Sequence, residues 1–459
     1  MKSGEKGRSF AAAFALVTNL FFLWAIAHNL NDILIKQFEK ALQLSRLQAS
    51  FIQIAFYVAY FIFALPAGYA MKRIGLKRSM VMGLFFYGVG AIAFYPAAEL
   101  GTFGAFLTAL FVIAGGIVCL EIAAGAFIVL GGAPERSAFR INLAQAFNGL
   151  GAVVAPIIGG MFIFSGQERS TAQMAQMSAA GLAEFRVAEL HQVQAPYLFI
   201  GMVAFAIAAL IAISRFPAES RGNASQPVSY GALFRQRTFT AAVAAQFAYV
   251  GAQVAVWSFF IDFVKDTRPE IEERTAAYLL SASLFLFMVG RFSGSLLLRS
   301  VRAPSALIAY GALACCATCA AVATTGYVSI ACLMAISFFM SIMYPTIFAL
   351  GVAAAREQSQ IGAAVMVMTI VGGAVIPPAL GFLADHFGVR PAYLLILVCF
   401  AVVMLFARFA KSAEAPPANR PADRHRETRS PTGDRPMTVP GAAQETCGDI
   451  PSASDPSRF

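Results

Sequence analysis

Residues 103–130 read FGAFLTALFVIAGGIVCLEIAAGAFIVL, a stretch in which Glu121 is the sole charged residue. About 20 consecutive apolar residues form a helix long enough to cross a bilayer, so this stretch predicts a membrane span. A charged acid near the bilayer centre costs about 2.5–3.5 kcal/mol on insertion scales and is kept where it faces a bundle interior or a water-filled cavity. Glu121 is therefore a candidate functional residue, with a structural hydrogen bond between helices as the alternative.

Similar apolar stretches recur along the chain, which has 459 residues, 59% of them hydrophobic and 13% charged. A soluble domain has about 45–50% apolar and about 25% charged residues. The alternating segments of about ten residues typical of outer-membrane barrels are missing from the sequence. The predicted fold class is all-α integral membrane, with twelve transmembrane helices at about 10–35, 47–70, 79–97, 103–130, 139–165, 196–216, 239–264, 276–298, 303–325, 328–352, 361–384 and 390–410.

The twelve predicted spans fall into two sets of six. When the two halves are aligned with each other, Trp24 corresponds to Tyr249 and Asp32 to Trp257, which indicates a weak internal repeat. Parallel repeats of this kind hold a substrate site between them near the midplane. The predicted parts are a cytoplasmic N-terminus at 1–9, a six-helix bundle at 10–216, a cytoplasmic linker at 217–238, a second six-helix bundle at 239–411 and a disordered cytoplasmic tail at 412–459. The tail is expected to be disordered because it has many Pro, Arg and Ser residues and few large apolar ones.

The net charge of +10 is distributed unevenly between the predicted loops. With the N-terminus inside, 18 Lys and Arg lie on the inner side and 9 in the outer loops; the densest group is Lys72, Arg73, Lys77 and Arg78. The positive-inside rule then places both termini of this multi-pass protein in the cytoplasm. The lipid bilayer is the expected partner, nucleic acid is not, and we expect a monomer.

The first predicted span has a polar face at its outer end. Trp24, His28 and Asp32 repeat every four residues, and Asn29 lies three residues before Asp32, so these side chains share adjoining helical faces. An aromatic ring can stack on the apolar face of a sugar while amide and carboxylate groups bind its hydroxyls. The pattern predicts a monosaccharide site; a polar seam that holds helices together is the alternative.

Further candidates lie in other spans. Desolvation penalises the charged form of a carboxyl, so Glu121 could carry a proton between a closed and an open state of the cavity. Asn142 and Gln145 form an amide stripe that could bind sugar hydroxyls or join helices. In the second half, Gln253 and Trp257 share a helical face, and Pro345 follows Tyr344 and interrupts the helix near its centre. The Gly372-Gly373 and Pro377-Pro378 pairs permit bending, either as a static kink or as a moving gate.

The sequence lacks the motifs of ATP-driven transport and offers little support for a metal or redox site. No phosphate-binding G-x-x-x-x-G-K-[ST] loop is present, which disfavours transport driven by ATP. The pair Cys316 and Cys319 lies in an apolar span without an accompanying His or acid, so small-residue packing is the better interpretation than a metal or redox site. We expect no enzyme activity, no metal and no cofactor, with the proton as the coupling ion.

The loop Gly68-x-x-x-Lys72-Arg73-x-Gly75-x-Lys77-Arg78 resembles the signature loop of the major facilitator superfamily, with Lys72 where that family usually has Asp. Other motifs resemble the bacterial L-fucose–proton symporter (fucose permease) family over residues 10–410. The motifs are 21–24 (FFLW), 29–34 (NLNDIL), 119–121 (CLE), 139–145 (FRINLAQ), 251–258 (GAQVAVWS) and 344–348 (YPTIF). Gly125-Ala126 departs from the Asn-Pro pair expected there.

The resemblance implies a major facilitator fold and a proton-coupled monosaccharide carrier of the bacterial inner (plasma) membrane, most similar to those for L-fucose. It implicates Asp32 and Glu121 in sugar binding and proton coupling, and it places Asn29, Gln145, Trp257 and Tyr344 around the cavity. The alternatives are a proton-linked carrier for glucose, galactose or another hexose, a drug exporter and, from a different class, a membrane sugar sensor that binds without transport.

Overall fold

The computed structural model describes residues 10–26, 46–162, 194–214 and 229–414, together with a few single positions between these ranges. Throughout these residues the regular structure is helical. His28, residues 30–45 with Asp32 among them, and the predicted tail from 415 onward lie outside the described residues.

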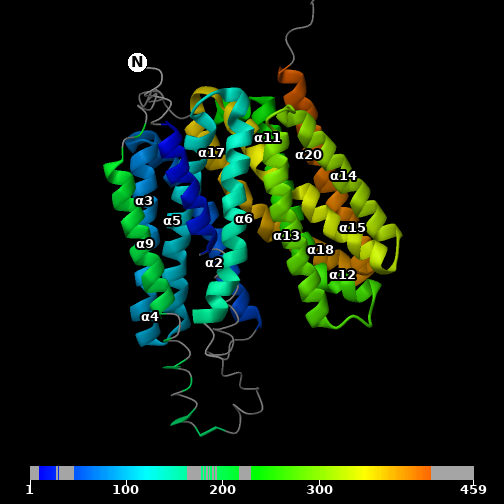
Figure 1. Cartoon of the computed structure of the whole chain (residues 1–459), viewed down its shortest axis with the longest axis horizontal. Helices are drawn as coiled ribbons and strands as arrows, with labels where there is room; N and C mark the ends of the chain where they lie inside the picture. The colour runs from blue at the N-terminus through cyan, green and yellow to red at the C-terminus, as the bar shows by residue number, and fades with distance from the viewer. Residues whose placement is uncertain are drawn as a thin grey trace, which may run out of the picture. The chain divides into compact units, whose positions relative to one another are not determined.

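The first half of the chain forms one set of packed helices (Figure 1). It contains the helix Phe10–Ile26, α2 (Arg46–Ile74), α3 (Leu76–Ile92), α4 (Phe94–Leu100), α5 (Phe103–Leu130), η1 (Pro134–Arg136), α6 (Ser137–Phe162) and α9 (Gln194–Ile213). Helix α5 packs against α2, α3 and α6. Its central position explains why it is apolar around almost its whole circumference and buried from Ile113 to Val129.

The second half forms the other set of helices, coloured green to orange in Figure 1. Its members are α10 (Tyr230–Phe234), α11 (Arg237–Ser258), α12 (Phe260–Thr267), α13 (Glu273–Leu297), α14 (Ala303–Ala323), α15 (Gly326–Met340), α16 (Met343–Ala354), η2 (Arg356–Gln358), α17 (Ser359–Met368), η3 (Thr369–Val371), α18 (Gly372–Phe387), α19 (Val389–Ala392) and α20 (Leu394–Glu414). The two halves meet where α2, α5 and α6 of the first pack against α13, α16 and α17 of the second.

Two predicted spans of the second half are interrupted near their centres. Helices α15 and α16 are separated at Ser341 and Ile342. Pro345 accounts for this break, since it has no backbone N–H to donate to the carbonyl of Ser341 four residues earlier and its ring crowds that carbonyl. The second interruption is η3, a short 3₁₀ segment directly before Gly372-Gly373, whereas α18 continues through Pro377 and Pro378.

Small residues set how closely the helices of the first half approach one another. A Cβ atom added to Gly116 of α5 would lie 2.4 Å from the backbone nitrogen of Tyr87 in α3, and one added to Gly90 of α3 would lie 2.6 Å from the nitrogen of Ile113 in α5. Backbones at this separation leave no room for any side chain. Close packing of this kind is how helices associate inside a bilayer, where the hydrophobic effect does not drive them together.

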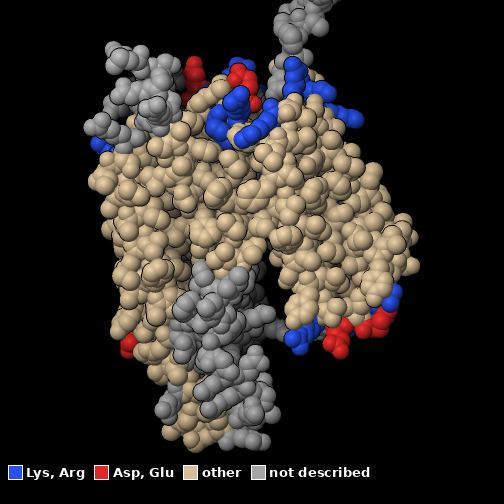
Figure 2. Space-filling view, in the orientation of Figure 1, with Lys and Arg blue, Asp and Glu red and all other residues tan. Residues whose placement is uncertain are grey.

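Ten helical segments of the described residues are long and apolar enough to cross a membrane. The other two predicted spans correspond to the helix Phe10–Ile26, the part of 10–35 that is described, and to α6. Figure 2 shows Lys, Arg, Asp and Glu gathered at the two ends of the bundle, with a belt free of these residues between them on the visible face. The predicted all-α membrane fold is therefore confirmed. Helix α20 includes the first three residues of the predicted tail, 412–414, and α10 and the start of α11 lie within the predicted linker.

Candidate functional site

Glu121 lies in the interior of the bundle, with 8% of its surface exposed. Its Oε1 accepts a hydrogen bond of 2.6 Å from the hydroxyl of Tyr344, and its Oε2 accepts one of 2.9 Å from the hydroxyl of Tyr60. Tyr60 belongs to α2 in the first half, whereas Tyr344 belongs to α16 in the second. The carboxyl group of α5 is therefore held by one phenol from each half of the molecule.

The local sequence explains how each group reaches this position. Glu121 is the single acid of the apolar helix α5, and its helix is buried on all sides there, so the side chain points to protein and not to lipid. Tyr344 is the second residue of α16, next to the break that Pro345 causes. Tyr60 lies on the buried face of α2, and its ring contacts that of Phe56 with centroids 5.5 Å apart.

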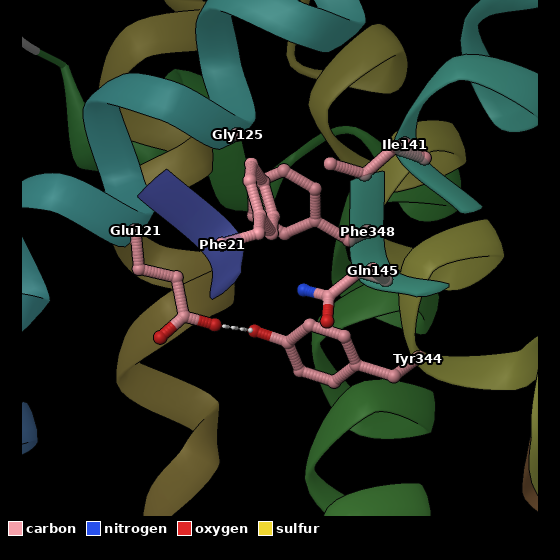
Figure 3. Close-up of a pocket in the computed structure, with 7 residues that line it drawn as sticks. All are labelled: Phe21, Glu121, Gly125, Ile141, Gln145, Tyr344 and Phe348. Carbon is pink, nitrogen blue, oxygen red and sulfur yellow. Dashed lines mark hydrogen bonds between the residues drawn. The ribbon is translucent and has the colours of Figure 1, made fainter. Parts of the chain in front are cut away.

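A small cavity adjoins this cluster (Figure 3). Its volume of ≈ 10 Å³ is about the space that one water molecule needs. It is lined by Phe21, Glu121, Gly125, Ile141, Gln145, Tyr344 and Phe348. A cavity of this size does not hold a monosaccharide, so a sugar could enter this region only after the surrounding helices move apart.

Arg291 of α13 is a buried cation whose role sequence reasoning missed. It has 5% of its surface exposed, and its Nη1 donates hydrogen bonds to the backbone oxygen of Gln145 at 2.7 Å, to Oε1 of Gln145 at 3.3 Å and to Oδ1 of Asn148 at 3.3 Å. It also interacts electrostatically with Glu121. A single Arg within the apolar stretch 276–298 was the signal in the sequence that could have identified it.

Asn142 and Gln145 of α6 both face the second half. The Nδ2 of Asn142 donates to the backbone oxygen of Ala138 at 2.8 Å and to Oγ1 of Thr346 at 3.1 Å. Thr346 is two residues after Tyr344 on α16. The predicted amide stripe thus makes direct contacts between halves, and Gln145 also lines the cavity.

The other predicted site residues that are described do not line the small cavity. Trp24 is buried against Phe21, with ring centroids 4.1 Å apart, and Asn29 donates to the backbone oxygen of Ala25 at 2.7 Å. Trp257 is half-buried, and its indole N–H donates to Oγ of Ser337 at 3.1 Å. Gln253 is half-buried one turn earlier on the same helix.

The structure therefore brings Glu121, Gln145 and Tyr344 together, with Asn142 beside them, and leaves Trp24, Asn29, Gln253 and Trp257 outside that cavity lining. His28 and Asp32 lie outside the described residues. Among the residues that are described, no group of three or more His, Cys, Asp or Glu side chains is arranged to hold a metal ion. The chemistry available at the cluster is hydrogen bonding and proton exchange at one carboxyl group.

Residues 9–377 match the Major Facilitator Superfamily. The chain belongs to this family. Membership confirms the predicted fold and makes the chain a multi-pass membrane transporter and not an enzyme. It also accounts for the arrangement around Glu121, because transporters built from two repeats place their sites near the midplane at the repeat interface.

Two relatives with assigned substrates align with this major facilitator over most of its length. It is 40% identical over 416 residues to the L-fucose-proton symporter of Escherichia coli (strain K12), an alignment that covers 89% of this chain and 95% of the relative. It is 35% identical over 401 residues to the glucose/galactose transporter of Brucella abortus biovar 1 (strain 9-941), which covers 87% of this chain and 94% of the relative.

Solved structures give the same result. The fold resembles the crystal structure of a major facilitator superfamily transporter, FucP, in the outward conformation, with a TM-score of 0.82 and 38% sequence identity over 88% of this chain and 99% of that one. A proton:xylose symporter, XylE, matches with a TM-score of 0.62 at 13% identity over 89% of this chain and 96% of that chain, a likeness that concerns the fold alone.

Proposed function

We propose that this chain is a proton-coupled symporter that imports a monosaccharide, L-fucose, across the bacterial inner membrane by alternating access, with both termini in the cytoplasm. The observation that carries the proposal is the Glu121 carboxyl group, buried between Tyr60 of the first half and Tyr344 of the second. An ionisable group at the contact between two repeats can link its protonation to the relative position of those repeats.

The coupling follows from the two charge states of Glu121. The ionised carboxylate accepts hydrogen bonds from both phenols and so favours the closed contact between α5 and α16. A proton bound from the outer solution removes this charge and weakens that preference, and its release to the inner side restores it. A sugar that bridges the halves would bind more tightly to one of the two arrangements and thereby shift their populations.

We propose two groups of functional residues. Asp32 and Glu121 couple the proton. The sugar is bound by Trp24, His28, Asn29, Asp32, Glu121, Asn142, Gln145, Gln253, Trp257 and Tyr344. The amides Asn142 and Gln145 support this assignment because they already face α16 and α13 of the opposite half.

L-fucose is proposed as the sugar because the named L-fucose symporter aligns at 40% identity, compared with 35% for the named glucose/galactose transporter. A glucose or galactose carrier is the second candidate, and Gly125 favours it. Gly125 lines the cavity beside Glu121, and it departs from the Asn expected in the L-fucose family, so the polar surface offered to the sugar differs at this point. A Cβ atom at this position would lie 3.0 Å from the ring of Phe348.

The test is uptake by purified protein in proteoliposomes with an imposed proton gradient. We expect accumulation of labelled L-fucose, with D-glucose and D-galactose competing weakly. A proton that crosses about 100 mV releases about 2.3 kcal/mol, which supports an accumulation of roughly 50-fold for one proton per sugar. Strong competition by glucose or galactose would instead identify this chain as a carrier for those sugars. Binding without any uptake would identify a sensor and contradict the transport proposal.

A further inference from the structure

Ser337 and Ser283 carry buried hydroxyl groups that the proposed function does not use. Ser337 lies on α15 and Ser283 on α13, and each has 0% of its surface exposed. Their Oγ atoms are 2.7 Å apart, with Ser283 donating and Ser337 accepting. The same oxygen of Ser337 also accepts the indole N–H of Trp257 on α11 at 3.1 Å. Three helices of the second half, labelled α11, α13 and α15 in Figure 1, therefore meet at one hydroxyl oxygen.

The Oγ atom of Ser337 is fully used as an acceptor. A Ser hydroxyl has two acceptor lone pairs, and here they receive the N–H of Trp257 and the O–H of Ser283. A donor that loses its acceptor inside a protein gives up a hydrogen bond and gains none from water. The N–H of Trp257 is therefore held firmly at this point.

Phe287 fixes the ring of Trp257 at a second point. The two ring centroids are 5.0 Å apart, and the planes meet at 87°, the edge-to-face arrangement that aromatic pairs favour. Phe287 is buried and lies one turn after Ser283 on α13, so both residues belong to the same face of that helix. One contact holds the N–H and the other holds the ring, and together they restrict rotation of the indole.

The surface that Trp257 leaves exposed is apolar. The residue is half-buried, and the N–H is the single polar group of an indole. Because Ser337 takes this N–H, the rest of the side chain offers carbon atoms and the face of the ring, which can contact the apolar face of a sugar but cannot bind its hydroxyls. A ring that is held in advance also loses less conformational freedom when a ligand binds.

We infer that Ser337 is a positioning residue for sugar binding. Its Oγ, which also accepts from Ser283, holds the Trp257 indole in the orientation that contacts the apolar face of a monosaccharide. The inference rests on the proposed function, which places Trp257 among the sugar-binding residues. It extends that function to a buried residue that acts through Trp257 and does not itself bind the sugar.

The experiment measures the state of the indole and the affinity for sugar in full-length protein. Ultraviolet resonance Raman spectra without sugar report whether the N–H of Trp257 is hydrogen-bonded, in a Trp24→Phe background where Trp257 is the single Trp. Calorimetry on protein that retains Trp24 gives the affinity for L-fucose, D-galactose and D-glucose. We expect Ser337→Ala to remove the signature of a bonded N–H and to weaken binding of the preferred sugar about threefold, the effect of ordering one more side chain on binding.

Three comparisons separate positioning from a general effect on the fold. In a Trp257→Phe background, which has no N–H, Ser337→Ala should weaken binding no further. Ser341→Ala, the same substitution one turn later, removes a buried hydroxyl that has no hydrogen-bond partner among the described residues, so it should change neither the Raman signature nor the affinity. Ser337→Cys keeps a side chain of similar size with a weaker acceptor. It should lose less affinity than Ser337→Ala, and it is the second variant if Ser337→Ala does not fold.

Wild-type affinity in a folded Ser337→Ala with a free N–H would overturn the inference. So would an unchanged Raman signature, or an equal loss of affinity in the Trp257→Phe background. The expected losses with D-glucose or D-galactose as the preferred sugar would uphold the inference and reject L-fucose as the substrate. The same losses in a protein that binds sugar without accumulating it would uphold the inference and reject only the transport proposal. If the wild-type protein binds none of the three sugars, the proposed function and the inference fail together.

Discussion

At the scale of single residues, the buried carboxyl of Glu121 shows how position gives a common side chain an unusual role. An isolated charge at this depth would be costly. Here two phenols donate to it and Arg291 lies within electrostatic reach. These contacts allow the ionised carboxylate to exist in the interior. Burial disfavours the charged form, so the protonated form also stays accessible.

Glu121→Gln should bind sugar and lose proton-driven accumulation. Gln keeps the volume of Glu and can still pair with both phenols, by accepting from one and donating to the other, but it cannot exchange a proton. Uptake against a sugar gradient and binding by calorimetry would be measured on the same preparation. Glu99→Gln, an exposed acid at the end of α4, is the matched control and should transport normally. Uphill uptake by Glu121→Gln at the wild-type level would contradict the assignment.

Trp257→Ala should weaken sugar binding by about 1 kcal/mol, or roughly fivefold in Kd, through loss of the aromatic surface. Trp257→Phe should have a smaller effect, because it keeps a ring next to Phe287 and loses only the N–H that donates to Ser337. Calorimetric titration of both variants with L-fucose is the measurement. Wild-type affinity in Trp257→Ala would remove this residue from the site.

At the scale of helices, interruptions and small residues place the functional groups. The break between α15 and α16 lies next to Tyr344, the second residue of α16. It sets the direction in which the Tyr344 hydroxyl reaches Glu121. Helices α2 and α17, which belong to different halves, pack with Gly68 against Ala364. Tyr60 lies two turns before Gly68 on α2, so the separation of these helices also affects how Tyr60 reaches Glu121.

Gly68→Leu should reduce transport at least tenfold. A Cβ atom at Gly68 would lie 2.4 Å from the Cβ of Ala364, so the two halves could no longer approach at this end of the bundle. Uptake rate and thermal unfolding in detergent would be compared with Gly104→Leu on α5, where an added Cβ meets nothing within 4 Å. Wild-type uptake by Gly68→Leu would mean that close approach of α2 and α17 is not part of the transport cycle.

At the scale of the whole molecule, the two halves are joined by a few polar contacts in an otherwise apolar interior. Tyr344 bonds to Glu121, Asn142 bonds to Thr346, and Arg291 bonds to Gln145 and Asn148. A rocking motion of the halves must break or exchange these hydrogen bonds. Each hydrogen bond contributes only a small net free energy, because the same groups could bond to water instead. A proton or a ligand can therefore switch the arrangement.

Arg291→Met should weaken sugar binding roughly tenfold while the protein still folds. Without its donor, the Gln145 amide is free to turn away from the site, which forfeits about one hydrogen bond to the sugar. Stability should change little, because the desolvation cost of a buried cation disappears along with its hydrogen bonds. Binding by calorimetry and thermal unfolding would be measured together.

The control for this prediction is Arg299→Met. Arg299 follows α13 and lies over the ring of Phe139 on α6, so it also contacts the other half but away from Gln145. Equal loss of binding in Arg299→Met would mean that any contact between the halves has this effect, and the specific role of Arg291 would then be rejected.

Truncation after Glu414 should leave transport intact. Helix α20 ends at this residue, and the remaining sequence has many Pro, Arg and Ser residues and few large apolar ones, a composition that does not support a packed core. Uptake normalised to the amount of inserted protein is the measurement. Loss of activity in correctly inserted protein would reveal a function of the tail.

The sequence by itself determined that this is a helical membrane protein, where most of its spans lie and that one span carries an acid, Glu121. Apolar stretches of about 20 residues are local features, so they identify membrane helices without any knowledge of the partners. The charge of Glu121 in such a stretch and the proline at 345 are equally local, and both predictions hold in the structure: the acid is buried and the helix is interrupted.

Only the tertiary structure decided which groups meet. Tyr60 and Tyr344 lie 61 and 223 positions from Glu121 along the chain, and Arg291 lies 146 positions from Gln145. Helical periodicity shows which residues share a face, but not which neighbouring helix that face contacts. The contact depends on how close the backbones come and how each helix is rotated, and these are set by packing across the whole bundle. The partners of Arg291 therefore emerge only from the assembled fold.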